Sequence, residues 1–284
     1  MGEKIPLVRL SNGMDIPALG FGTYKMTEEK NAQDIARAIQ MGYRMIDTAW
    51  MYENEKIVGR AIKECGVPRK SLTIATKVWP NYYGTDDTLF SVERSLRDLG
   101  VDYLDILYLH WPGKGYKESW RVLESCLEQG IARAIAVCNL REEHLEKLST
   151  YANVKPVINQ IELHPQLQEK ALRAYLKEKG IQPVAYSPLA RGKNGIYEEG
   201  SVQQAAKNHG RLPSQILLRW HIQEGIIPIP KATSEEHQKS NLKVFDFSLT
   251  EQEMADLEET DQNLRIGKLS TDEEQMRWYA SRPK

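Results

Sequence analysis

The chain has 284 residues and a formal net charge of -1, with 41% hydrophobic and 27% charged residues. This composition excludes a disordered chain, a collagen-like repeat and a disulfide-stabilised scaffold. The balanced charge argues against binding nucleic acid by phosphate neutralisation, and no apolar run approaches the roughly 18 residues that a membrane span needs.

The cysteines and the N-terminus bear on the cellular compartment. Cys65, Cys126 and Cys138 form no C-x-x-C pair, which is typical of a reducing compartment and of a chain without structural zinc. The first ten residues contain Glu3 and no long apolar run, so a secretory signal is not predicted. We therefore expect a soluble, cytoplasmic protein.

Short apolar runs alternate with longer amphipathic segments along the whole chain. The runs predict eight strands, at 18–22, 43–47, 72–77, 104–110, 131–139, 157–160, 181–187 and 226–231. The segments between them predict helices at 28–40, 86–99, 121–129, 141–148, 168–179 and 213–223, with an extra helical segment at 202–208. The strands lack strict alternation of apolar and polar residues, as expected for parallel strands covered on both faces.

Eight such units predict an α/β fold, a TIM (β/α)8 barrel, with an open doubly wound sheet as the alternative. At the front, residues 8–10 and 14–16 flank Asn12-Gly13 and predict a β-hairpin. This hairpin either closes the N-terminal mouth of the barrel or lies exposed. No linker or change of composition interrupts the chain, so residues 1–284 are expected to form a single domain.

Active sites in such barrels lie at the C-terminal ends of the strands. Polar residues stand at nearly every predicted strand end: Asp47 with Tyr52 five residues on, Lys77, His110, Asn139, Gln160, Tyr186-Ser187 and Lys231. Any one of them can be a turn former or a helix cap. Their convergence at one end of a barrel is instead typical of a catalytic site.

This set of residue types is suited to carbonyl reduction. A tyrosine has a pKa near 10, and a nearby lysine ammonium stabilises its anion and lowers that pKa. Asp47 can orient Lys77, and His110 can donate a hydrogen bond to a carbonyl oxygen. Since no side chain delivers hydride, the chemistry requires a nicotinamide, whose carboxamide Asn139 and Gln160 can bind. Tyr186 can stack on its ring and Lys231 can meet an adenosine phosphate.

The sequence also contains two other candidate motifs, a dinucleotide-binding loop and a set of metal ligands. Gly20-Phe21-Gly22 begins like a dinucleotide fingerprint but lacks the third glycine, so a Rossmann site is not predicted. Glu162 and His164 could join His110 as metal ligands, which would indicate a metal-dependent hydrolase or lyase. Pro165 favours instead a turn that contains a structural histidine.

At these residues the sequence resembles the aldo-keto reductase superfamily, along nearly the whole chain. The short loop after Trp111 is similar to the bacterial branch of 2,5-diketogluconate and glyoxal reductases. The matching segments are 20–24, 42–49 with Tyr52, 76–79, 105–112, 159–165, 185–189 and 229–231.

The resemblance implies a TIM barrel that binds NADP(H) without a Rossmann fold and reduces small aldehydes, ketones or dicarbonyls. The resemblance implies that Tyr52 is the proton donor, that Lys77 and Asp47 adjust the pKa of Tyr52, and that His110 orients the carbonyl group. It implies a substrate pocket of Tyr24, Trp79, His110 and Trp111. The cofactor residues that it implies are Gly22, Thr23, Asp47, Asn139, Gln160, Tyr186, Ser187, Leu189, Lys231, His237 and Asn241. A monomer with a small-molecule carbonyl substrate is expected; the alternative is a non-catalytic nicotinamide-binding sensor or structural protein.

The sequence departs from the family pattern at three positions. Cys138 replaces a hydroxyl that binds the carboxamide, while Ala232 and His237 replace a serine and an arginine that grip the 2'-phosphate of NADP. A neutral alanine and a mostly neutral histidine weaken a charged contact, so we expect a reduced preference for NADPH and real use of NADH. The tail at 264–284 is expected either to reach over the barrel mouth, through Arg277, Trp278 and Tyr279, or to dock on the barrel wall.

Overall fold

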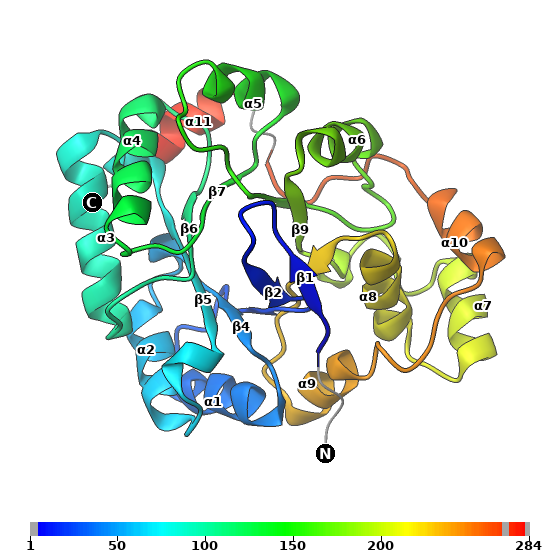
Figure 1. Ribbon diagram of the computed structural model, residues 1–284. Coiled ribbons are helices and arrows are strands. Elements are labelled where there is room, and N and C mark those ends of the chain that lie inside the picture. The colour runs from blue at the N-terminus through cyan, green and yellow to red at the C-terminus, as the bar shows by residue number, and fades with distance from the viewer. Residues whose placement is uncertain (1–4, 269–272, 282–284) are drawn as a thin grey trace.

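A computed structural model describes residues 5–268 and 273–281 of the chain. Its centre is one sheet of eight parallel strands, surrounded by helices (Figure 1). In chain order the strands are β3 (Phe21–Gly22), β4 (Met45–Asp47), β5 (Thr73–Val78), β6 (Ile106–Leu109), β7 (Ile135–Cys138), β8 (Ile158–Glu162), β9 (Gln182–Tyr186) and β10 (Ile227–Pro228). Each strand pairs with the next one along the chain, as repeated β-α units require.

The first and last strands meet and close the sheet. The Gly20 amide donates to the Pro228 carbonyl and the Gly22 amide to the Pro230 carbonyl, both at 3.0 Å. A Cβ at Gly22 would lie 2.8 Å from the Ile229 carbonyl oxygen, so a larger residue would force this seam apart. Closure confirms the predicted TIM barrel and excludes the open doubly wound sheet.

The N-terminal hairpin lies across one mouth of the barrel (Figure 1). Strands β1 (Leu7–Arg9) and β2 (Asp15–Pro17) are antiparallel, and their turn places Gly13 at a φ of 86°, which favours glycine. Leu10 and Ile16 are buried in the same cluster as the inward-facing residues of the strands. The hairpin therefore closes the bottom, as the sequence predicts.

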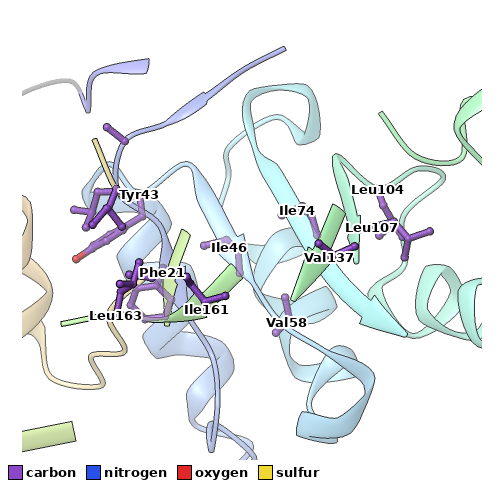
Figure 2. Packing of buried hydrophobic residues seen from close by; sticks show 14 of the residues in the cluster. Phe21, Tyr43, Ile46, Val58, Ile74, Leu104, Leu107, Val137, Ile161 and Leu163 are labelled. Carbon is purple, nitrogen blue, oxygen red and sulfur yellow. The ribbon is translucent and has the colours of Figure 1, made fainter. Parts of the chain in front are cut away.

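Alternate residues of each strand face opposite sides of the barrel wall. Those that face inward, such as Met45, Ala75 and Tyr108, form the inner cluster beneath the site. Those that face outward pack against the helices, and Figure 2 shows part of this outer cluster. It includes Ile46 and Ile74 from neighbouring strands and Val58 from the helix at 55–64. This period of two determines which polar residues at the strand ends enter the barrel.

The helices that cover the barrel agree broadly with the sequence prediction. They are α1 (Asn31–Met41), α2 (Glu55–Glu64), α3 (Thr85–Leu99), α4 (Tyr116–Glu128), α5 (Glu142–Ser149), α6 (Lys170–Lys179), α7 (Gly200–His209), α8 (Pro213–Gln223), α9 (Glu235–Leu242), α10 (Glu251–Glu258) and α11 (Glu273–Ala280). Within the described residues, no helix has both the length and the apolar character that crossing a membrane demands.

Some helices differ from the prediction for local reasons. The helix α2 was not predicted, and its central Gly59 is explained by packing, because a Cβ there would lie 2.5 Å from the Leu99 carbonyl oxygen at the end of α3. The helix α4 begins at Tyr116, earlier than position 121. Ser119 supports this earlier start, because its hydroxyl donates to the Gly115 carbonyl at 2.9 Å. The helices α9 and α10 were also missed.

Candidate active site

The polar residues at the strand ends converge on the C-terminal mouth because they continue the inward-facing rows of the strands. Asp47 stands two residues beyond Met45, and Lys77 two beyond Ala75. His110 follows Tyr108 in the same way, directly after β6. The residues beneath these polar groups, such as Ala75, are buried and apolar. The polar groups therefore lie together at the open mouth, above an apolar layer.

A buried ion pair lies at the centre of the cluster. The Lys77 ammonium donates to Asp47 Oδ1 at 2.5 Å and to the Thr48 carbonyl at 2.8 Å. The other carboxylate oxygen accepts from Gln160 Nε2 at 2.8 Å. Burial is the largest single influence and lowers the pKa of Lys77, but the charge and hydrogen bond of Asp47, together with Tyr52 and Cys138, raise that pKa above its ordinary value. Lys77 is therefore held as a cation.

Tyr52 lies above this ion pair, in a short 3-10 turn after β4. The Lys77 ammonium is 5.0 Å from the centroid of the Tyr52 ring, and the His110 ring is 5.8 Å from it. Burial raises the pKa of Tyr52 to about 12, while the charge of Lys77 acts in the lowering direction. The sequence predicted a lowered pKa from Lys77 alone; desolvation dominates here, and Tyr52 is a protonated hydroxyl at neutral pH.

His110 is buried between Tyr52 and Trp79. Its ring meets the Trp79 ring edge-on at 5.0 Å, and its Nδ1 has no hydrogen-bond partner among the described residues. Burial, together with the charge of Lys77, lowers the pKa of His110 well below its ordinary value. A neutral imidazole with an unpaired ring nitrogen is suited to bind a polar group of a ligand.

Further residues from β7, β8 and β9 lie beside the cluster. Asn139, held at a φ of 60°, donates from Nδ2 to the His110 carbonyl at 3.0 Å. The Tyr186 hydroxyl donates to Asn139 Oδ1 at 2.9 Å. Two amide side chains, of Asn139 and Gln160, thus stand next to an aromatic ring, a set that fits the carboxamide and ring of a nicotinamide. Cys138 is buried, and burial raises the pKa of its thiol well above the ordinary value, which makes it unreactive.

The residues predicted to meet the rest of a cofactor lie farther round the mouth. Thr23 follows the seam residue Gly22, and its buried hydroxyl donates to the Asp47 carbonyl at 3.0 Å. Ser187, at a φ of 49°, and Leu189 follow β9 and are partly exposed. Lys231 and His237 are exposed at the end of the last strand and the start of α9, whereas Asn241 and Ala232 are buried.

Arg191 is a residue at the mouth that the sequence reading missed. Its Nε donates to the Ser187 hydroxyl at 3.1 Å, and its guanidinium lies 5.8 Å from the Tyr24 ring. The position of Arg191 four residues after Ser187 offered only a weak indication, since exposed arginines are common. Its contacts place a cation beside Ser187, one of the residues expected to bind the cofactor.

Aromatic side chains form the wall opposite the amide groups. Trp79 and Trp111 are buried, and Tyr24 packs 5.1 Å from the Tyr52 ring. The tail helix α11 adds Tyr279, whose ring lies 4.8 Å from that of Trp79 and 5.0 Å from that of Trp111. The Trp79 indole also donates to the Tyr279 carbonyl at 2.9 Å. Of the three tail residues expected to reach the mouth, Tyr279 does so, whereas Arg277 and Trp278 are exposed on α11.

The alternative metal ligands are engaged elsewhere. His164 lies in a turn closed by hydrogen bonds with Leu167, as Pro165 suggested, and contacts Glu162 at 3.4 Å. The Glu162 carboxylate accepts from the backbone amides of Ile266 and Gly267. Over residues 5–268 and 273–281, no three His, Cys, Asp or Glu side chains gather closely enough to hold a metal ion.

Comparisons with known proteins agree with this geometry. A family model described as the aldo/keto reductase family matches residues 18–262. The chain is 42% identical over 262 residues to a glyoxal reductase of Bacillus subtilis, covering 92% of this chain and 94% of the relative. It is 40% identical to a morphine 6-dehydrogenase of Pseudomonas putida, over 94% and 95% of the two chains. A crystal structure of a Bombyx mori aldo-keto reductase in complex with NADP aligns with a TM-score of 0.89 at 32% identity, covering 94% of this chain and 96% of that one.

Proposed function

Because this chain belongs to the aldo/keto reductase family, we propose that it reduces small aldehydes, ketones or dicarbonyls to alcohols at the mouth that holds Tyr52. The observation that carries the proposal is the buried Lys77–Asp47 pair beneath a protonated tyrosine and a neutral histidine. The aromatic wall of Trp79 and Trp111 beside them gives an apolar surface for a small organic substrate.

In the proposed mechanism, His110 binds the carbonyl oxygen and orients it toward Tyr52. When bound, a reduced nicotinamide supplies the hydride that attacks the carbonyl carbon. The Tyr52 O–H bond breaks and its proton passes to the carbonyl oxygen, so the C=O double bond becomes a C–O single bond with a new C–H and a new O–H bond. The resulting tyrosinate is stabilised by the Lys77 ammonium, 5.0 Å from the ring, until solvent returns the proton.

The residues beside the cluster fit a nicotinamide cofactor. Asn139 and Gln160 would bind its carboxamide and Tyr186 would stack on its ring. The Asp47 carboxylate keeps Lys77 charged in the process. Lys231 is the exposed cation for an adenosine phosphate, and NADP is bound by the Bombyx mori relative. NADPH is therefore the first cofactor to test.

The same residues suggest that NADH is also used. Ala232 provides no side-chain hydrogen bond, and exposed His237 replaces a permanently charged guanidinium at the start of α9. We expect the ratio of kcat/KM with NADPH to that with NADH to rise about tenfold or more in the variant His237→Arg, since a charged hydrogen bond contributes about 1.5–3 kcal/mol. An unchanged ratio would show that position 237 does not contribute to the choice between NADPH and NADH.

The test of the reductase function is turnover by Tyr52→Phe. The wild-type protein should consume NADPH with a panel of small aldehydes and dicarbonyls, followed by the absorbance of reduced nicotinamide. The variant should lose about 100- to 10,000-fold in kcat while still binding the cofactor. Tyr116→Phe is the matched control, because the buried Tyr116 hydroxyl has no hydrogen-bond partner among the described residues. Full activity of Tyr52→Phe would exclude Tyr52 as proton donor, and binding of NADPH without turnover in the wild type would favour a non-catalytic sensor.

A further inference from the structure

A buried carboxylate holds the C-terminal tail against the candidate site. The helices α10 and α11 lie on different sides of the molecule, and residues 259–268 extend from the end of α10 past the C-terminal ends of β8 and β9 (Figure 1). On the way, the Ile266 amide donates to Glu162 Oε1 and the Gly267 amide to Oε2, both at 2.7 Å. Glu162 is fully buried and stands two residues beyond Gln160 on the same strand. One carboxylate thus binds two consecutive backbone groups that lie about a hundred residues away in sequence.

The contact is so close that a side chain at position 267 would displace the Glu162 carboxylate. A Cβ on Gly267 would lie 2.7 Å from Glu162 Oε2 and 3.4 Å from the Tyr186 hydroxyl. Glu162 and Tyr186 are register partners on β8 and β9. The tail backbone at Gly267 therefore lies beside the hydroxyl of Tyr186, the residue proposed to stack on the nicotinamide.

Charged side chains hold the same segment in place. The Arg265 guanidinium lies 3.9 Å from Glu162 and also pairs with Glu169, which in turn pairs with Arg141. Burial alone would raise the pKa of Glu162, but hydrogen bonds from His164 and the two tail amides lower it below its ordinary value. Glu162 is thus anionic at neutral pH, when its bonds to the amides are strongest.

The contact is continuous with the proposed cofactor residues. Tyr186 donates to Asn139, and Asn139 donates to the His110 carbonyl. A shift of the tail at Gly267 would open space beside the Tyr186 hydroxyl, which donates the bond to Asn139. Farther along, the same tail places Tyr279 on Trp79. The tail is therefore attached at both the cofactor side and the substrate side of the mouth.

We propose that Glu162 is a positioning residue that latches residues 265–267 onto Tyr186 and so retains the bound nicotinamide cofactor. The inference rests on the proposed function, since it assigns the latch to the same cofactor site. It predicts that loosening the latch speeds cofactor release and weakens cofactor binding. The carbonyl substrate, which binds on the aromatic side, should be affected less.

The test combines amide hydrogen exchange with NADPH binding in Glu162→Gln. Glutamine provides one acceptor oxygen in place of two and turns an N–H group toward a donor. Exchange at Ile266 and Gly267 should accelerate about tenfold or more, as expected for loss of a charge-assisted hydrogen bond. The Kd and release rate of NADPH should rise by a similar factor, and the KM for NADPH should rise while the KM for the carbonyl substrate changes less than threefold.

Glu124→Gln is a matched control. Buried Glu124 also accepts from two consecutive amides, those of Asn153 and Val154, at 2.6 and 2.8 Å, but away from the mouth. This variant should accelerate exchange at Asn153 and Val154 and leave the Kd of NADPH within twofold of the wild type. If both variants weaken NADPH binding equally, the effect is general destabilisation and the latch is rejected.

Gly267→Ala disturbs the same contact from the tail side, because the added Cβ would lie 2.7 Å from Glu162 Oε2. Since Glu162 itself is unchanged, this variant replaces Glu162→Gln if the latter does not fold. It should also speed exchange at Ile266 and weaken NADPH binding. Faster exchange with unchanged NADPH release, or unchanged exchange in both variants, would overturn the latch alone. A wild-type protein that binds neither NADPH nor NADH would instead refute the proposed function and, with it, the role of the latch.

Discussion

The buried ion pair at the base of the site gives the sharpest stability prediction. In Asp47→Asn, a single amide oxygen replaces two carboxylate oxygens that accept from Lys77 and Gln160. The side chains of Lys77 and Asp47 are 0% and 2% exposed, so water cannot replace the lost partner. The variant leaves a lysine that must either remain charged without a counterion or lose its proton.

The expected cost follows from this burial. Removing one partner of a buried ion pair costs about 3–5 kcal/mol. At about 2–4 °C per kcal/mol for large domains, the Tm should fall by roughly 10 °C. Because the folded-state pKa of Lys77 is raised, its stabilising contribution is complete below the unfolded-state pKa of about 10.4 and is lost only as the pH rises through the folded-state value. The full difference should therefore be present at pH 7.

A double variant distinguishes two causes of lower stability, namely the unpaired charge of Lys77 and the loss of hydrogen bonds to Asp47. Asp47→Asn combined with Lys77→Met removes the charge that Asp47→Asn leaves behind, so the double variant should be more stable than the single one. Asp15→Asn, which breaks the exposed Arg9–Asp15 pair, should change stability by less than about 1 kcal/mol. Thermal unfolding at pH 7 measures all three. A Tm of Asp47→Asn within 2 °C of the wild type, or a double variant less stable than the single, would refute the reasoning.

Three further outcomes are expected. The kcat/KM for carbonyl reduction should stay flat from about pH 6 to about pH 9, because His110 is neutral and Tyr52 protonated throughout; an inflection near the ordinary histidine pKa in a pH–rate profile would contradict this. Ile16→Ala should lower the free energy of unfolding by about 2–5 kcal/mol in denaturant titrations, while kcat is unchanged, because Ile16 is buried at the closed end of the barrel. Tyr279→Ala should raise the KM for the carbonyl substrate several-fold and leave the KM for NADPH unaffected, as steady-state kinetics with both ligands varied can establish.

Local patterns in the sequence predict the repeated β-α units and the residues of the central cluster, because hydrophobic periodicity is local information. The choice between a barrel and an open sheet is made by the seam, where Gly20 pairs with Pro228 and Gly22 with Pro230. The period of two along each strand carries Asp47, Lys77 and His110 inward, and the structure places them together with Tyr52. The helices α9 and α10 were missed, since short polar helices carry little periodicity and are stabilised by their contacts.

Properties that depend on residues distant in sequence, such as a pKa or a long-range contact, could be recognised only in the three-dimensional structure. The pKa of Tyr52 depends on how completely the fold desolvates its ring, so the neighbouring lysine alone predicted the wrong direction. Glu162 and Gly267 are 105 residues apart, and nothing local in either segment indicates that one carboxylate binds the other's amide. The place of Tyr279 against Trp79 and Trp111 could likewise not be predicted from the sequence, because it depends on where α11 packs. Such contacts arise when chain segments that are remote in sequence pack together, and local patterns cannot encode which segments meet.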